Sequence, residues 1–391
     1  MTMMDTIRGI YANPQRGACT ESERAASAFV YDVMEKEGFA PRFHEFTVHP
    51  DFHVAYSLHF VLAILFGLVA HCCPVLSIVG LVFVMLSFYG DATLRWYWLR
   101  RLTRKGSSRH VIGRVGPDNA KRTIILSGHH DAGQTSKWIF EPAKLKAQQR
   151  FWKQKLGAPM PQYVLIFGGM ALVLLSAVLR ALGHSCVFTQ GFEVVGVIVC
   201  AIAAFGHMTM YKKGFGGGAS DNASGVAASI EIARRLRDDL PPDTNLVVLS
   251  FGAEETMVMG SGTTVKRIFA GVNRENTYAI NLDGVGGGDI RYCLGEGLLC
   301  VYPFDPELVA AAKYVARKPG FERLIPYTIR SGASDALPFV HAGIKAISLI
   351  GLDEDDYPPN YHWHTDTPEN IDERSLELAV SASIQMIRRL D

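Results

Sequence analysis

Two long apolar blocks constrain the fold of this chain more than any other feature of its sequence. The first covers residues 52–90 and the second residues 163–211, and each is almost free of charged side chains. A helix needs roughly 17–25 apolar residues to span a bilayer, so each block is too long for one span, and a turn-like stretch breaks each near its middle. We therefore predict two transmembrane helical hairpins with four spans. The alternatives are a pair of buried helices in a soluble protein and, for the first block, a re-entrant pair.

Composition narrows the class of protein further. Hydrophobic residues make up 48% and charged residues 20% of the 391 residues, where about 25% charged is usual for soluble domains. A net charge of +1 lacks the basic excess of a nucleic-acid-binding protein, so we predict no nucleic-acid partner. Seven cysteines without a CxxC pair exclude a disulfide scaffold and a cysteine-rich zinc module. The polar N-terminal stretch predicts no cleavable signal peptide.

Basic residues flanking the apolar blocks predict an orientation in the membrane. The two hairpin tips carry almost nothing basic beyond Arg180, so the tips should face outward and the rest of the chain the cytoplasm. Glu193, near the outer end of the fourth span, is either a functional intramembrane acid or an interfacial residue. Three cysteines lie near the tips, where pairing stays open: Cys72, Cys73 and Cys186. The basic residues on the other side are Arg95, Arg100, Arg101, Arg104, Lys105, Lys144, Lys146, Arg150, Lys153, Lys155, Lys212 and Lys213.

The water-soluble remainder shows the pattern of an α/β fold. The chain divides into residues 1–51, 91–162 with its basic juxtamembrane segments, and 212–391, separated by the hairpins at 52–90 and 163–211. Apolar runs that predict strands cover residues 123–128, 245–251, 277–282 and 345–351. Segments with helical period alternate with them, one of which has Ser224 as its predicted N-cap. This alternation predicts a mostly parallel sheet with helices on both faces.

Histidines and carboxylates follow the predicted strands. Parallel strands place their carboxyl ends at one edge of a sheet, where ligands bind. Each residue alone has an ordinary explanation, such as a polar turn, a solvated helix start or a helix cap. Together they indicate a metal site, because zinc binds histidine nitrogen and carboxylate oxygen, and two ions share a bridging carboxylate. The candidates are His129, His130, Asp131, Asp221, Glu254, Glu255, Asp283, His362 and His364.

The ordered motifs HHD, GASDNASG, FGAEETMVMGSG, NLDGVGGG and HWHTDTPEN resemble those of the di-zinc exopeptidases of the bacterial leucyl aminopeptidase type. That family also holds glutamate carboxypeptidases and, with one zinc, glutaminyl cyclases. The resemblance covers about residues 106–135 and 215–391, and residues 1–50 would supply the first helix and strand. It implies the zinc-exopeptidase fold, with the two hairpins as insertions.

The resemblance also implies a role for each matching residue. Asp221 would bridge two zinc ions, one completed by His129 and Asp283. The other ion would be completed by Glu255 and His362. Two catalytic roles remain: Glu254 would be the general base, and Asp131 would orient His129. The family ligand lies four positions before the Asp of its DT pair, here Asp366, which favours His362 and leaves His364 as the alternative.

The activity implied is that of a membrane-embedded zinc aminopeptidase, which removes N-terminal residues from peptides through a metal-bound hydroxide. Its partners would be a peptide with a free N-terminus and the lipid bilayer. Alternatives are a carboxypeptidase or glutaminyl cyclase on the same scaffold, or an inactive receptor or scaffold. Ser334 and Asp335 match a family loop that shapes the substrate pocket. Arg330 beside them would bind a substrate carboxylate or form a surface salt bridge, and the glycine runs 216–218 and 286–288 would allow close backbone approach around the metals.

Overall fold

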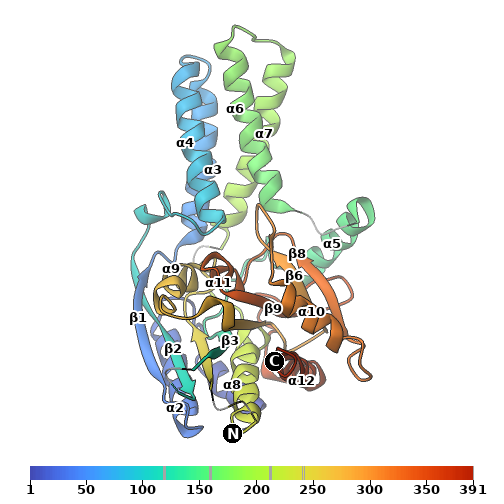
Figure 1. The fold of residues 1–391 in the computed structure, drawn as a ribbon. Coiled ribbons are helices and arrows are strands. Elements are labelled where there is room, and N and C mark those ends of the chain that lie inside the picture. Colours follow the sequence, from blue (N-terminus) through green and yellow to red (C-terminus); the bar gives the residue numbers. More distant parts are fainter. Residues whose placement is uncertain (118–119, 158–160, 211–213, 240, 242, 391) are drawn as a thin grey trace.

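The computed structural model describes residues 1–117, 120–157, 161–210, 214–239, 241 and 243–390. Figure 1 shows an α/β part and four long helices that rise together from one end of it, with the N-terminus at the opposite end. The helical part contains the two apolar blocks, and the α/β part contains the motifs with the metal-type residues. The α/β class expected from the sequence is therefore observed.

A nine-stranded sheet forms the centre of the α/β part, in the order β1-β2-β4-β3-β5-β9-β6-β7, with β8 paired to β6. The four apolar runs become β3, β4, β5 and β9, which pair parallel to one another and are largely buried. The strands are β1 (Arg42–Val48), β2 (Gly106–Val115), β3 (Arg122–His129), β4 (Thr244–Phe251), β5 (Thr277–Asp283), β6 (Asp289–Glu296), β7 (Tyr302–Pro303), β8 (Leu324–Ile329) and β9 (Lys345–Leu352).

The sheet as a whole is mixed, so the prediction of a mostly parallel sheet holds only for its centre. Strands β1, β2 and β4 are joined by antiparallel pairs, and β6 is antiparallel to β7 and β9. The sequence prediction rested on continuous apolar runs, which mark strands buried on both faces, and such strands lie at the centre of a parallel sheet. The less apolar flanking strands carried no comparable pattern.

Helices cover both faces of the sheet (Figure 1). Helices α1, α8 and α12 pack together, α8 lies against β3 and β4, and α11 packs on α9 and β9. Buried side chains from both sets meet the central strands in one apolar core. The helices of this part are α1 (Met3–Tyr11), α2 (Glu21–Lys36), α5 (Pro142–Leu156), α8 (Gly225–Leu236), α9 (Met259–Ile268), α10 (Pro306–Val315), α11 (Ala336–His341) and α12 (Glu373–Ile387).

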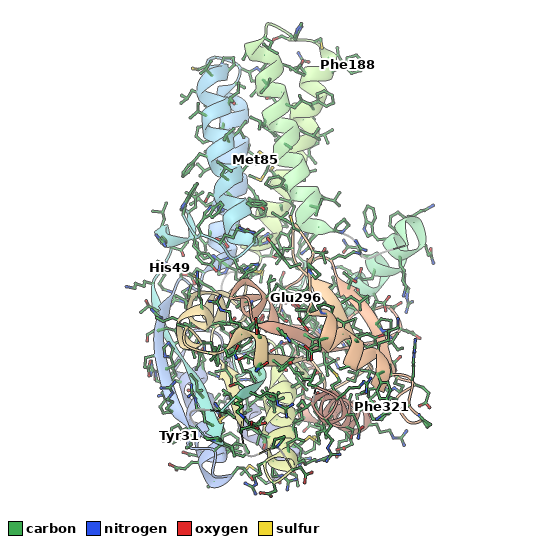
Figure 2. All side chains as sticks on the ribbon, viewed as in Figure 1. Tyr31, His49, Met85, Phe188, Glu296 and Phe321 are labelled. Carbon is green, nitrogen blue, oxygen red and sulfur yellow. The ribbon has the colours of Figure 1, made fainter. Side chains whose placement is uncertain are left out.

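The two apolar blocks form a bundle of four helices, each long and apolar enough to cross a membrane. They are α3 (Phe52–Val69), α4 (Pro74–Ala92), α6 (Gln162–Ala181) and α7 (Val187–Met208). Helix α3 packs on α4 and α7, and α6 packs on α4 and α7, so the two hairpins lie side by side. Figure 2 shows Met85 within the bundle and Phe188 at its far tip. The end of the second block at Tyr211 and the flanking Lys212 and Lys213 lie outside the described residues.

Glu193 links the two hairpins at the end far from the sheet. Its carboxylate lies 2.8 Å from Nε2 of His71, in the tip of the first hairpin, and 2.7 Å from a guanidinium nitrogen of Arg180 in α6. The acid is therefore ion-paired within the bundle. The tip cysteines Cys72 and Cys73 are exposed and free, as is Cys186.

Both insertions leave the sheet through closed bases. The first hairpin departs after β1 and returns at β2, and these strands pair so that Val48 lies opposite Gly106. The second departs after β3 and returns before α8, and an isolated bridge joins Gln134 to Phe215 across its base. Each hairpin thus occupies the place of a loop.

Candidate metal centre

The carboxyl ends of the parallel strands bring the predicted metal ligands together. His129 is the last residue of β3 and lies opposite Phe251, the last residue of β4, so Glu254 and Glu255 follow at the same edge. Asp283 ends β5. The two remaining residues come from loops, Asp221 from the turn before α8 and His362 from the segment after β9. Residues far apart in the sequence thus meet at one edge of the sheet.

Asp221 lies between two groups of possible ligands. Its Oδ1 is 3.2 Å from Nε2 of His129, and Oδ1 of Asp283 is 3.7 Å from the same nitrogen. Its Oδ2 is 3.4 Å from Nε2 of His362, which lies 2.9 Å from Oε2 of Glu255. In each group the ligand atoms lie within 4.8 Å of one another. One carboxylate therefore presents a separate oxygen to each group, as a bridging ligand does.

The donor set fits metal ions better than a closed hydrogen-bond network. Oε1 of Glu255 and Nδ1 of His362 are buried without a hydrogen-bond partner among the described residues. Four carboxylates, from Asp221, Glu254, Glu255 and Asp283, crowd around two imidazoles. Buried charge is costly unless it is paired or coordinates a metal, and here acids outnumber the basic groups. The cluster therefore has the donor atoms and the negative charge that metal cations require.

The pKa values of the cluster reflect this excess of negative charge. Burial lowers the pKa of His362, but the charge of Glu255 and the contact with Asp221 outweigh it and raise the pKa to about 10. Burial raises the pKa of Glu255 to about 7. Burial and neighbouring acids also raise the pKa of Glu254 well above its usual value, while His129 opposes the shift. The carboxylates repel one another, because few basic side chains lie among them.

Asp131 holds the loop that carries Glu254 and Glu255. Its two carboxylate oxygens accept hydrogen bonds from the backbone N–H groups of Glu254 (3.1 Å) and Glu255 (3.0 Å). Nδ1 of His129 lies 3.2 Å from the backbone carbonyl oxygen of Asp131 and 3.6 Å from its carboxylate. The residue predicted to orient His129 therefore also fixes the neighbouring loop.

Asp366 holds the loop that carries Asp221, as Asp131 holds the loop of Glu254 and Glu255. The sequence patterns did not indicate this role for Asp366. Its carboxylate accepts hydrogen bonds from the backbone N–H groups of Ser220 (2.7 Å) and Asp221 (3.0 Å). Gly217 allows this approach, because a Cβ there would overlap the carbonyl oxygen of Asp366. The glycine run at 216–218 thus serves close backbone approach, as expected.

Two charged residues of the N-terminal part, Arg16 and Glu23, also support the site and were missed. Arg16 is buried and donates hydrogen bonds to the carbonyl oxygens of His130 (2.9 Å) and Gly217 (2.8 Å). Glu23 accepts a hydrogen bond from the backbone N–H of Ala253 (2.9 Å), next to Glu254. Burial raises the pKa of Glu23 to about 8. Both residues act on backbone far away in the sequence, which no local motif reveals.

The other residues that the sequence suggested for the site have different surroundings. His364 is exposed and lies outside the metal-type groups of the described residues, whereas His362 is 8% exposed. His130 points away from the cluster, with Nδ1 2.9 Å from Oγ of Ser250. Asp335 is buried and accepts a hydrogen bond from Ser261 Oγ (2.5 Å), while Arg330 is exposed.

The metal centre lies against the base of the helical bundle. Phe140 contacts the His362 ring, with centroids 4.6 Å apart, and also packs against the apolar core of the bundle. Met257, two residues after Glu255, belongs to the same apolar cluster, as do Leu298 and Leu299. In Figure 2, Glu296 marks this region beneath the bundle. Side chains next to the metal ligands therefore pack directly against the apolar helices.

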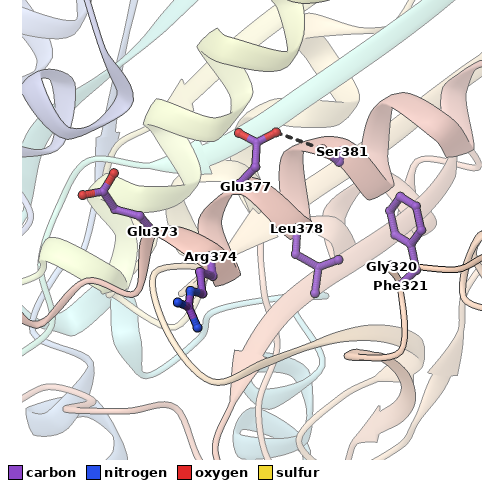
Figure 3. A pocket seen from close by; sticks show the side chains of 7 residues that line it. All are labelled: Gly320, Phe321, Glu373, Arg374, Glu377, Leu378 and Ser381. Atoms are coloured by element: carbon purple, nitrogen blue, oxygen red, sulfur yellow. Dashed lines mark hydrogen bonds between the residues drawn. The ribbon is translucent and has the colours of Figure 1, made fainter.

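A separate surface hollow of about 490 Å³ lies elsewhere (Figure 3). It is formed by the start of α12 and the turn at Gly320 and Phe321, and Arg374 and Leu378 line it. None of the metal-type residues contributes to it. The hollow is shallow and remote from the sheet edge, so it does not define the site.

Comparison with known proteins agrees with the fold. Residues 201–387 match the sequence model of peptidase family M28, a range that includes Asp221, Glu254, Glu255, Asp283 and His362. Aminopeptidase YwaD of Bacillus subtilis is 31% identical over 170 residues, which are 42% of this chain and 36% of the relative. The probable lipoprotein aminopeptidase LpqL of Mycobacterium tuberculosis is 28% identical over 186 residues, 41% of this chain and 37% of the relative. The matches thus span little more than a third of either relative.

Solved structures show the same fold over nearly the whole chain. A zinc aminopeptidase from Bacillus subtilis has a TM-score of 0.55 at 14% identity, covering 99% of this chain and 94% of the other. Porphyromonas gingivalis glutaminyl cyclase has a TM-score of 0.59 at 14% identity, covering 100% of this chain and 98% of the other. The chain therefore has a zinc-exopeptidase fold, and its sequence is similar to that of M28 zinc aminopeptidases.

Proposed function

We propose that this protein is a membrane-embedded metallopeptidase that holds two zinc ions and removes N-terminal residues from peptides. The observation that carries the proposal is the placement of Asp221 between two complete ligand groups, His129 with Asp283 and Glu255 with His362. Similarity to aminopeptidases named in two bacteria supports the reaction class.

Each residue of the site has a separate role in the proposed hydrolysis. Zinc, when bound, would activate a water molecule and polarise the scissile carbonyl. Glu254, which lies 3.6 Å from Nε2 of His129 and outside the Asp221–Glu255–His362 group, accepts the proton of the attacking water and passes it to the leaving amine. Asp131 and Asp366 keep the loops of Glu254 and Asp221 in place through their backbone N–H groups.

Sequence similarity favours an aminopeptidase over a carboxypeptidase. The curated relatives that the chain matches are named an aminopeptidase and a probable lipoprotein aminopeptidase. The nearest buried cation, Arg16, uses its donors on backbone carbonyls. A glutaminyl cyclase needs one zinc, and the presence of both His129 and Asp283 argues for the second ion.

The exposed side chains of the bundle support a membrane location. Of the 30 exposed large hydrophobic residues in the described chain, 20 lie on α3, α4, α6 and α7. Apolar patches of this extent are rare on soluble monomers and suit a lipid environment. The basic flanks support a catalytic part on the cytoplasmic side, with the hairpin tips outside.

An apolar peptide reaching the site at the membrane surface is the substrate we expect. Phe140 contacts the ring of His362, Met257 follows Glu255 by two residues, and both pack against the bundle core, so the site is apolar on this side. Peptides left by the cleavage of membrane segments have this character.

The decisive assay uses the purified protein in liposomes. Free and N-acetylated forms of the same peptide, in an apolar and a polar sequence of equal length, are compared with and without chelator. We expect chelator-sensitive release of the N-terminal residue from the free apolar peptide. Hydrolysis of the blocked form alone, or cyclisation of an N-terminal glutamine without hydrolysis, would exclude an aminopeptidase, and a polar preference would exclude the proposed substrate class.

Orientation is tested by thiol labelling in intact cells. An impermeant reagent should label the tip cysteine Cys186 and not a cysteine introduced at exposed position Arg374 of α12. A reductant control shows whether Cys72 and Cys73 are paired. The opposite labelling pattern would reverse the proposed topology.

A further inference from the structure

The loop that carries Glu254 and Glu255 is held from the membrane side as well as from the sheet. Three non-glycine residues in it have positive φ angles, Ala253 (54°), Met257 (59°) and Val258 (58°). Such conformations are strained and persist only where surrounding contacts fix them. Glu23 and Asp131 bind the N–H groups of residues 253–255. The second half of the loop is bound to the first, with the Val258 N–H donating to the Glu254 carbonyl oxygen (2.6 Å), and it also has a support from outside the loop.

Arg100 supplies that support. One guanidinium nitrogen, Nη1, donates a hydrogen bond to the carbonyl oxygen of Thr256 (2.5 Å), the residue after Glu255. The other two nitrogens face Asp91, with Nε 2.9 Å from Oδ2 and Nη2 2.5 Å from Oδ1. Asp91 lies in the last turn of α4, a membrane-spanning candidate, and Arg100 in the turn that follows it. All three groups are buried, with the Arg100 side chain 0% and that of Asp91 1% exposed.

The geometry fixes the direction in which Arg100 donates. Asp91 binds the guanidinium along one edge with two hydrogen bonds, which leaves Nη1 aimed at Thr256. The rings of Tyr56 in α3 and Tyr97 lie 5.4 Å and 5.5 Å from the guanidinium carbon and prevent it from swinging away. Met257 packs against the bundle beside this contact. The first hairpin and the metal loop are thus joined by a rigid, desolvated connection.

We propose that the Asp91–Arg100 pair is a positioning element through which the first membrane hairpin sets the Glu254–Glu255 loop for catalysis. The proposal rests on the proposed peptidase function. Zinc ligation would hold the Glu255 side chain, whereas the Glu254 side chain has a 3.6 Å contact with Nε2 of His129 and otherwise depends on its backbone, which Asp131 binds. Loss of the connection should therefore disturb Glu254 most, and a misplacement on the order of 1 Å can lower a rate about 100-fold.

The test removes the connection without leaving a buried charge unpaired. Breaking such a pair from one side is strongly destabilising, but replacing both partners is often neutral. The main variant is therefore Asp91→Asn with Arg100→Met. A second variant, Arg100→Lys, keeps the charge opposite Asp91, but a single ammonium group cannot hold both Asp91 and Thr256. The control is Asp51→Asn with Arg104→Met, an ion pair at the start of the first hairpin (3.2 Å, Arg104 side chain 56% exposed).

We expect the double variant to lower kcat about 10–100-fold with KM within about twofold and zinc content unchanged, and Arg100→Lys to be intermediate. In zinc-free protein, hydrogen exchange of the amides in residues 252–258 should be faster in both variants than in wild type or the control. Wild-type kcat and wild-type exchange in folded variants, or equal changes in the control, would overturn the proposal. If the double variant does not fold, Arg100→Lys decides by the same measurements. A wild-type protein without peptidase activity would refute the proposed function, and the exchange measurement would still decide the positioning role.

Discussion

Glu254 and Glu255 are adjacent in sequence, yet the structure predicts opposite consequences for their amide substitutions. Glu255 Oε2 lies 2.9 Å from Nε2 of His362 and shares a group with Asp221, so it is placed to bind metal. Glu254 lies 3.6 Å from Nε2 of His129 and belongs, with His129 and Glu255, to a third group of possible ligands that does not include Asp221. Glu254→Gln removes a proton acceptor and leaves both three-residue ligand groups around Asp221 intact, whereas Glu255→Gln removes a charged ligand.

The expected magnitudes follow from these positions. Loss of a general base typically lowers a rate about 10²–10⁴-fold, which is about 3–5 kcal/mol in the activation barrier. Glu254→Gln should therefore lower kcat by that factor and keep its zinc. Loss of an outer partner of a metal ligand already lowers metal affinity about 10–100-fold, so Glu255→Gln, which changes a direct ligand, should lower zinc affinity more than that.

The assay measures kcat, zinc content by elemental analysis and zinc affinity by chelator competition for both variants in parallel. Glu377→Gln, in an exposed ion pair of α12 with Arg235, is the control for amide substitution as such. The roles would be exchanged if Glu254→Gln lost zinc while Glu255→Gln kept it and turned over slowly. Equal zinc loss in both would show that Glu254 is itself a ligand.

Elemental analysis of active wild-type protein should give two zinc ions per chain, and one ion would refute a bridging Asp221. His362→Ala should lower zinc content and activity far more than His364→Ala, because only the first histidine lies in the buried cluster, and equal losses would overturn that choice. Burial raises the pKa of Glu296 to about 8 from an ordinary value of 4.5, so the protonated side chain stabilises the fold below about pH 4.5 and this contribution is lost as the pH rises toward 8. Glu296→Gln should accordingly raise Tm relative to wild type more at pH 8 than at pH 5, and a constant difference would contradict this.

Local sequence patterns predicted the central strands of the sheet and the four long helices of the bundle. Continuous apolar runs marked β3, β4, β5 and β9 nearly to the residue, and hydrophobic length marked the four bundle helices. The position of the ligands followed from the same strands, because parallel strands end at one edge. Strands with mixed burial, such as β1 and β8, had no comparable pattern. The strand β1 was expected only from the resemblance, which placed a strand within residues 1–50, and β8 was not foreseen.

The supports of the site depend on contacts that a sequence pattern does not contain. Asp366 appeared only as a reference for counting to His362, but its carboxylate binds the backbone of Ser220 and Asp221. Even a local prediction failed where such contacts compete. Ser224 stands at the N-cap position of α8, yet its hydroxyl donates to the Ser220 carbonyl (2.6 Å), and Asn222 Oδ1 accepts the N–H of Gly225 (2.9 Å) instead. Serine is a suitable capping residue, but in the tight loop around Asp221 the Ser224 hydroxyl bonds to the Ser220 carbonyl and does not cap the helix.

The closed bases of the two insertions explain how a bundle of apolar helices can join this fold without disturbing it. Pairing of Val48 with Gly106, and of Gln134 with Phe215, brings the ends of each insertion together, so the sheet is continuous whether the connection is short or long. Both insertions leave from the end of the α/β part from which the bundle rises (Figure 1). The second base follows directly on the His129–Asp131 turn, and the first is tied to the Glu254 loop through Arg100. Insertion at these two places therefore puts the loops of the candidate metal site between the sheet and the bundle.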